Sequence, residues 1–108
     1  MDIDEEIKKF IKRLSSKIEI KKIIIFGSTA RGNRLKQSDV DLIVISDDFE
    51  KMPLNERFRI VYMEWPKAID ADIIPLTESE FNKAEKLSVI LRDAKKYWKV
   101  IEIRKDQH

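Results

Sequence analysis

The first hydrophobic residues of the chain recur at spacings of three and four positions: Ile3, Ile7, Phe10, Ile11, Leu14 and Ile18. This spacing places them on one face of a helix. The acidic residues at the start of the segment favour a helix beginning there, because carboxylates interact well with the positive end of the helix dipole. The pattern therefore predicts an amphipathic helix over residues 4–16.

Four later segments are rich in β-branched and other apolar residues, and they predict strands over residues 20–26, 40–45, 69–76 and 97–103. Two of these strands carry acids within their apolar runs. Asp41 interrupts the second strand, and Asp70 and Asp72 interrupt the third. Because an unpaired buried carboxylate costs several kcal/mol, these acids indicate a function rather than a contribution to the core.

The segments between the predicted strands have patterns of their own. Residues 29–35 predict a short helical segment, and residues 47–53 predict a polar loop. Residues 54–65 predict a helix that ends before Pro66, because a proline disfavours helix at the preceding residue. Residues 77–80 have the capping-box pattern Thr-Glu-Ser-Glu, which predicts the start of the last helix.

The predicted helices and strands alternate along the chain in the order αβ(α)βαβαβ. This order predicts a single α/β (α+β) domain over residues 1–108, with a small mixed sheet flanked by helices. Within the helix over residues 54–65, the helical spacing of Phe58, Tyr62 and Trp65 favours burial in the core over an exposed platform for stacking bases.

Composition narrows the function classes. Lysine and arginine number 22 against 20 aspartates and glutamates, so the net charge of +2 does not provide the concentrated basic face of a nucleic-acid-binding protein. The absence of cysteine excludes thiolate zinc sites and thiol nucleophiles. The apolar runs are too short for a membrane span, and the acidic start is unlike a secretory signal. We therefore expect a cytoplasmic protein that does not enter a membrane and does not take nucleic acid as its direct substrate.

The two glycines of the chain, Gly27 and Gly32, lie close together after the first predicted strand. Gly27 allows a sharp turn at the strand end, and with Ser28 it leads into a helix N-terminus whose free N–H groups can receive a phosphate. Asp39 and Asp41 follow at the start of the second strand, where their side chains project from the same face. Two carboxylates so placed can share a pair of magnesium ions about 3.5 to 4 Å apart.

A third acid is expected beside this pair. Asp72 is the better candidate, because Ala71-Asp72-Ile73-Ile74 repeats the pattern of Val40-Asp41-Leu42-Ile43. Asp70 shares its strand face and remains the alternative. For Ser28 to meet Asp39 and Asp41, strands one and two must be antiparallel. The long helical connection between strands two and three is typical of a parallel pair, and it brings Asp72 beside the start of strand two.

These residues carry a resemblance to a known family. Gly27-Ser28-Thr29-Ala30-Arg31-Gly32, Ser38-Asp39-Val40-Asp41-Leu42-Ile43-Val44 and the later Asp72 resemble the minimal nucleotidyltransferases of the DNA polymerase β superfamily. The resemblance implies the polymerase β-like nucleotidyltransferase fold. It also implies magnesium-dependent transfer of a nucleoside monophosphate to a hydroxyl acceptor. The expected donor is ATP, which would supply AMP.

The resemblance assigns a role to each matching residue. Gly27 and Ser28 would hold the β and γ phosphates, and Arg31 would add positive charge near the triphosphate, with Arg34 and Lys36 as alternatives. Asp39 and Asp41 would bind both Mg²⁺ ions. Asp72 would bind the ion that lowers the pKa of the acceptor hydroxyl.

Small stand-alone members of this family are often antitoxins paired with a HEPN-domain ribonuclease toxin, and some add AMP to a tyrosine of the toxin. The resemblance therefore implies an antitoxin that modifies a HEPN-domain partner. The alternative is a non-catalytic antitoxin or adaptor that neutralises its partner by direct binding. A transferase acting on RNA ends has less support from the modest basicity, and homo- and hetero-oligomers both remain open.

Overall fold

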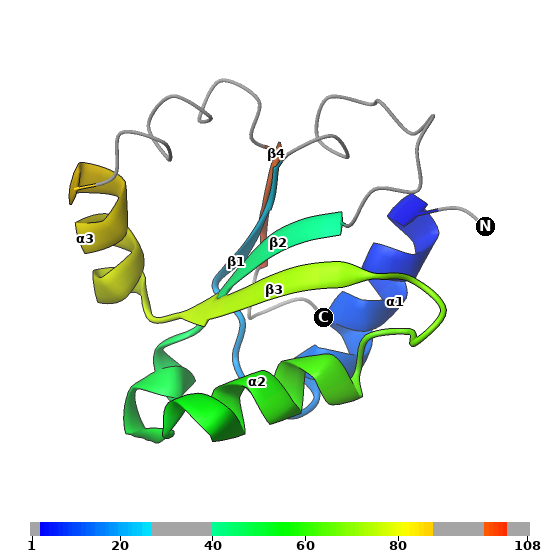
Figure 1. Cartoon of the computed structure of the whole chain (residues 1–108), viewed down its shortest axis with the longest axis horizontal. Coiled ribbons are helices and arrows are strands. Elements are labelled where there is room, and N and C mark those ends of the chain that lie inside the picture. The colour runs from blue at the N-terminus through cyan, green and yellow to red at the C-terminus, as the bar shows by residue number, and fades with distance from the viewer. Residues whose placement is uncertain (1–2, 27–39, 88–98, 104–108) are drawn as a thin grey trace.

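A four-stranded mixed sheet forms the centre of the computed structural model, which describes residues 3–26, 40–87 and 99–103 (Figure 1). The strands are β1 (Lys22–Phe26), β2 (Val40–Ile45), β3 (Ala71–Leu76) and β4 (Lys99–Glu102). Their order across the sheet is β3-β2-β1-β4. β1 is antiparallel to β2 and to β4, whereas β2 is parallel to β3. The strand directions predicted from the acids and the turn are therefore confirmed.

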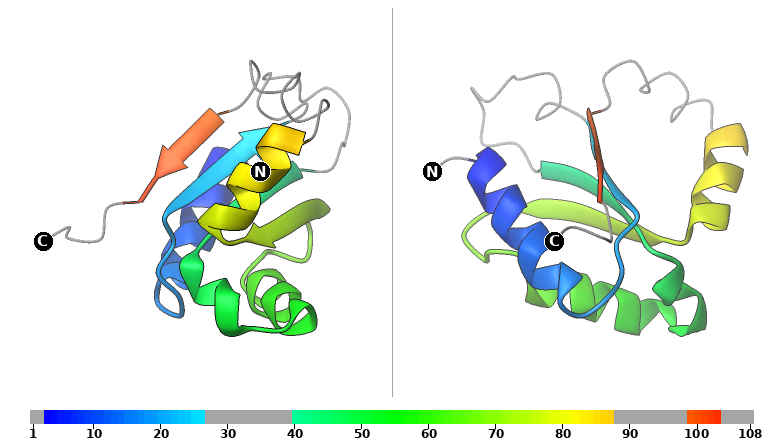
Figure 2. Two further views of the ribbon diagram at one scale, coloured as in Figure 1. Left: turned by 90° about the vertical axis from the view of Figure 1, so that its left-hand side faces the viewer. Right: turned by 180° about the vertical axis from the view of Figure 1, so that it is seen from behind.

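Helices cover both faces of this sheet (Figures 1 and 2). They are α1 (Ile3–Ser15), the short 3-10 helix η1 (Asp47–Lys51), α2 (Leu54–Met63) and α3 (Glu78–Leu87). Because side chains alternate between the faces of a strand, the sheet divides its apolar residues between two clusters. The larger cluster contains residues of α1 and α2, and the smaller one contains Phe81 of α3.

The larger cluster is built by the residues whose spacing predicted α1. Ile7, Phe10 and Leu14 are buried against the sheet residues Leu42 and Val44. The predicted amphipathic helix is confirmed, with each boundary shifted by one residue.

The segment after β2 is more ordered than the predicted polar loop. It forms η1, with Ser46 as its N-cap. The Ser46 hydroxyl donates to the carbonyl of Glu19 at 2.7 Å and accepts from the N–H of Asp48 at 3.2 Å. Phe49 is fully buried and anchors the turn to the core. The loop prediction was wrong because a single apolar residue among acids has no periodicity.

The aromatic residues of the segment predicted as a helix over residues 54–65 divide differently from the prediction, and Trp65 follows the end of α2. Trp65 lies in the core, where its ring meets Phe10 edge-on at 5.1 Å and its indole N–H donates to the carbonyl of Ile69 at 2.8 Å. Phe58 and Tyr62, however, are 41% and 38% exposed. The expectation of burial is wrong for these two, because α2 covers the edge of the sheet and presents this part of its surface to solvent.

The predicted capping box at the start of α3 is confirmed. The Thr77 hydroxyl accepts from the N–H of Glu80 at 3.1 Å, and the Glu80 carboxylate accepts from the N–H of Thr77 at 2.9 Å. The predicted helical segment over residues 29–35 lies outside the described residues. In the part of the chain that is described, no helix is long and apolar enough to cross a membrane.

Candidate active site

Two of the predicted acids meet at one end of the sheet. In the parallel pairing of β2 with β3, Asp41 lies directly opposite Asp72. Residues opposite each other in neighbouring strands are about 5 Å apart and project from the same face. Asp41 is half-buried, whereas Asp72 is exposed. The pair therefore offers carboxylate oxygens at a position that solvent and a substrate can reach.

The end of β1 arrives at the same place. Phe26, the last residue of β1, pairs with Asp41 in the antiparallel register, so β1 ends beside the start of β2. Asp39 directly precedes that strand. Gly27, Ser28, Arg31 and Asp39 themselves lie outside the described residues, so their roles stay predictions.

The alternative acid, Asp70, occupies a different position. It directly precedes β3, and its carbonyl accepts a hydrogen bond from the N–H of Val40 at 3.1 Å. Asp72 is the residue that the strand register places opposite Asp41. The geometry favours Asp72 over Asp70 as a partner of Asp41.

The chemistry of this pair fits a hard divalent cation. Carboxylate oxygens are the ligands that Mg²⁺ prefers, and the ion normally keeps several waters beside one or two carboxylates. Among residues 3–26, 40–87 and 99–103, no three acidic or histidine side chains gather in a way that could hold a metal ion. Asp41 and Asp72 therefore supply part of a site, and the third predicted ligand, Asp39, lies outside those ranges.

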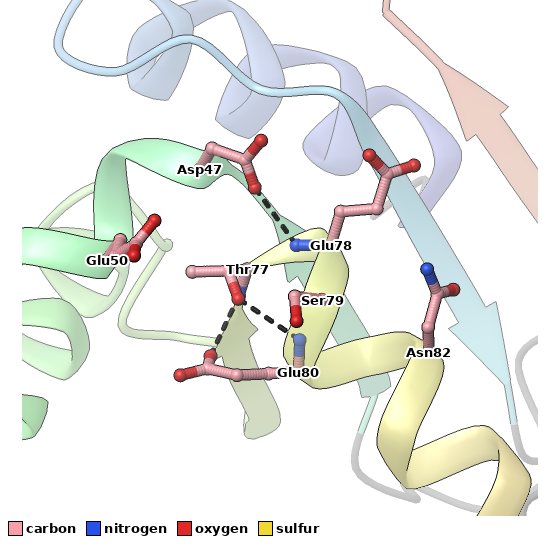
Figure 3. A pocket seen from close by; sticks show the side chains of 7 residues that line it. All are labelled: Asp47, Glu50, Thr77, Glu78, Ser79, Glu80 and Asn82. Carbon is pink, nitrogen blue, oxygen red and sulfur yellow. Dashed lines mark hydrogen bonds between the residues drawn. The ribbon is translucent and has the colours of Figure 1, made fainter.

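The opposite end of the sheet holds a hollow of about 440 Å³ between η1 and the start of α3 (Figure 3). Four carboxylates line it: Asp47, Glu50, Glu78 and Glu80. Lys21 forms ion pairs with Asp47 at 2.7 Å and with Glu78 at 2.9 Å. Its ammonium lowers the pKa of Asp47, and the pKa of Lys21 is raised in return. The remaining negative charge would repel a triphosphate, so this hollow does not fit a nucleotide.

Glu80 gives the fold a pH dependence that can be measured. The Arg57 guanidinium, together with the N–H of Thr77, holds the pKa of Glu80 below its ordinary value of 4.5. Because the folded pKa is lowered, the stabilisation is complete above about pH 4.5 and is lost as the pH falls through the folded value. We expect Glu80→Gln to lower the free energy of unfolding at pH 7 and to have a smaller effect at pH 3, as measured by urea unfolding.

Glu50→Gln is the matched control for this prediction. Glu50 lines the same hollow, whereas the ion pair with Arg57 is made by Glu80. Equal effects of Glu80→Gln at the two pH values would contradict the contribution of the charged Glu80.

Comparison with known proteins identifies the family of this chain. The family model described as "Nucleotidyltransferase domain" matches residues 5–106. The chain therefore belongs to the nucleotidyltransferase domain family, and the prediction of a nucleotidyltransferase enzyme is confirmed.

Two relatives from Methanocaldococcus jannaschii carry the name "Putative protein adenylyltransferase". MJ0604 is 45% identical over 53 residues, which are 46% of this chain and 53% of that protein. The match thus spans about half the length of this relative. MJ0141 is 35% identical over 77 residues, which are 68% of this chain and 75% of that protein.

Solved structures share the fold. A structure described as "a putative nucleotidyltransferase from Sulfolobus solfataricus" has a TM-score of 0.56 and 25% identity, covering 75% of this chain and 78% of that one. A mutant of the toxin–antitoxin MntA–HpeT has a TM-score of 0.57 and 17% identity, covering 93% of this chain and 72% of that one. The predicted fold class is confirmed by these neighbours.

Proposed function

We propose that this protein is a magnesium-dependent nucleotidyltransferase that transfers AMP from ATP to a tyrosine hydroxyl of a HEPN-domain toxin, and that it acts in this way as an antitoxin. The observation that carries the proposal is the register of Asp41 against Asp72, at the end of the sheet where β1 leads into Gly27 and Ser28. Family membership over residues 5–106 supports the reaction class.

In this proposal, Asp39, Asp41 and Asp72 hold Mg²⁺, while Gly27, Ser28 and Arg31 bind the triphosphate. When bound, Mg²⁺ neutralises phosphate charge and lowers the pKa of the acceptor hydroxyl. The acceptor hydroxyl gives up its proton to water, its oxygen forms a bond to the α-phosphorus, and the bond from the α-phosphorus to the leaving pyrophosphate breaks. The protein contributes positioning and charge compensation, which are the main sources of catalysis in phosphoryl transfer.

Two observations support a protein as the acceptor. The relatives MJ0604 and MJ0141 carry the name "Putative protein adenylyltransferase". In addition, Asp72 is exposed at the start of an edge strand, so a side chain of another macromolecule can approach it. The shared fold with a toxin–antitoxin protein is consistent with a toxin as that macromolecule.

The proposal is tested by incubating the protein with Mg²⁺, labelled ATP and the protein encoded beside it in the genome. We expect the partner to acquire label from ATP labelled at the α-phosphate but not at the γ-phosphate, because AMP is the group transferred. Chelation of Mg²⁺ by EDTA is the control and should abolish labelling. Label from the γ-phosphate would indicate a kinase and contradict the proposal, as would a lack of label from the α-phosphate.

Neutralisation in cells separates catalysis from direct binding. If AMP transfer neutralises the toxin, Asp39→Asn combined with Asp41→Asn should fail to protect cells although the protein is present at its normal level. Full protection by this double variant would mean that binding alone neutralises the partner.

A further inference from the structure

The hydroxyl of Tyr62 forms two hydrogen bonds with the backbone of β3. Tyr62 lies on α2 and is 38% exposed, and its ring stacks on that of Phe58 with ring centres 6.4 Å apart. Its hydroxyl donates to the carbonyl of Ala71 at 3.1 Å and accepts from the N–H of Ile73 at 2.8 Å. One side-chain oxygen therefore bridges two backbone groups of the same strand.

The two bridged groups flank Asp72. The carbonyl of Ala71 belongs to the peptide plane before Asp72, and the N–H of Ile73 belongs to the plane after it. The rotation of these planes about the Cα atom defines the φ and ψ angles of Asp72. The hydroxyl of Tyr62 thus restricts both backbone angles of one residue, and these angles set the direction of its Cα–Cβ bond.

The opposite side of the strand is held by the sheet. The carbonyl of Asp70 accepts from Val40 of β2. Since alternate residues of a strand turn their peptide groups to the same side, the backbone of Asp72 also faces β2. Asp72 is therefore restricted from β2 on one edge and from Tyr62 on the other.

β3 is an edge strand, and such a strand normally leaves its outer N–H and C=O groups to water. Here α2 covers part of that edge: Arg57 donates to the carbonyl of Pro75 at 3.4 Å, and Pro75 itself has no N–H to satisfy. Arg57 contacts β3 near its end, whereas Asp72 lies near its start. Tyr62 acts at the start of the strand, where Asp72 lies opposite Asp41.

We propose that Tyr62 is a positioning residue for the active site, with its hydroxyl fixing the backbone of Asp72 so that this carboxylate and Asp41 are directed toward the same Mg²⁺. The inference rests on the proposed function, in which Asp72 is a metal ligand. Metal sites require their ligands to be held within about 0.5 Å, so a strand free to rotate at residue 72 would bind the ion less well.

The test uses Tyr62→Phe, which removes the hydroxyl and keeps the ring, with Phe58→Leu as the matched control on the same exposed surface of α2. Changes to groups that orient metal ligands typically cost about 10- to 100-fold in affinity or activity. We expect Tyr62→Phe to fall at the lower end of this range, so that Mn²⁺ affinity and kcat are each reduced about tenfold. The KM for ATP should change by less than about twofold. Phe58→Leu should leave Mn²⁺ affinity, kcat and KM near their wild-type values.

Two further measurements separate positioning from a general structural role. Amide exchange of Ile73 should accelerate in Tyr62→Phe and not in Phe58→Leu. In an Asp72→Asn background, Tyr62→Phe should cause no further loss of Mn²⁺ affinity, because the ligand that it orients is already absent. Mn²⁺ affinity is followed by electron paramagnetic resonance, which does not depend on turnover.

These experiments distinguish a failure of the positioning role from a failure of the proposed function. Unchanged Mn²⁺ affinity in Tyr62→Phe, or an equal further loss in the Asp72→Asn background, would overturn the positioning role. If wild type binds Mn²⁺ through Asp72 and Tyr62→Phe weakens that binding, but no AMP is transferred to any partner, the positioning role stands and the proposed reaction is wrong.

Discussion

Replacing Asp72 or Asp41 by asparagine is expected to reduce AMP transfer by at least about a hundredfold, since removal of one electrostatic contact to a transition state costs about 10²- to 10³-fold. Asparagine keeps the size of the side chain and removes the charge that would hold Mg²⁺.

The two acids lie directly opposite each other in neighbouring strands. Their like charges oppose folding when no metal is bound. The thermal midpoint of metal-free Asp72→Asn should therefore be no lower than that of wild type, while its activity is lost.

Asp70→Asn is the control for this prediction. Asp70 precedes β3, and its backbone carbonyl accepts the hydrogen bond from Val40, which the substitution keeps. We expect its initial rate of partner labelling to stay within about threefold of wild type, because the strand register places Asp72, and not Asp70, opposite Asp41. Loss of activity in Asp70→Asn with retention in Asp72→Asn would contradict the assignment and make Asp70 the ligand.

The sequence was sufficient to predict the strand arrangement around this site. The apolar run over residues 40–45 coincides with β2, because a buried strand is continuous in hydrophobic residues and has sharp polar boundaries. Asp41 and Asp72 interrupt such runs, and this local conflict is typical of functional positions. Requiring the turn after β1 to meet the acids at the start of β2 made these two strands antiparallel, and the long helical connection from β2 to β3 made that pair parallel. The register confirms both directions.

The surface of α2 could not be predicted in the same way. Phe58, Tyr62 and Trp65 have the same helical spacing, but only Trp65 is in the core. Their burial depends on where α2 crosses the sheet, and that position is set by tertiary packing rather than by local periodicity. The hydroxyl of Tyr62 bonds to residues 9 and 11 positions away, on an edge strand, and no sequence pattern indicates such a bridge.

Arg57 is a second residue whose role follows from tertiary contacts alone. Its side chain is 7% exposed and forms a two-pronged ion pair with Glu80, with N–O distances of 2.8 and 3.2 Å. It also donates to the carbonyls of Met52 and Pro75, and its guanidinium lies 5.8 Å from the ring centre of Phe49. The ion-pair partner is 23 positions away in the sequence. Arg57 therefore ties η1, α2, β3 and α3 together.

Replacing Arg57 by methionine is expected to lower the free energy of unfolding by about 2 to 3 kcal/mol. Breaking a buried ion pair by removing one partner typically costs about 3 to 5 kcal/mol, and the partial exposure of Glu80 reduces that cost because water can solvate its carboxylate. Arg57→Lys keeps the charge but cannot reproduce the planar fork, so it should fall between methionine and wild type. Urea unfolding at pH 7 measures each difference.

Arg59→Met is the matched control on the same helix. Arg59 pairs with Glu56 at the surface and its side chain is 59% exposed. Exposed pairs contribute about 0 to 1 kcal/mol, so this substitution should have little effect. Combining Arg57→Met with Glu80→Gln should cost less than the sum of the single changes, since both remove the same ion pair. A cost for Arg57→Met no larger than that for Arg59→Met would contradict the role of Arg57 in joining the four elements.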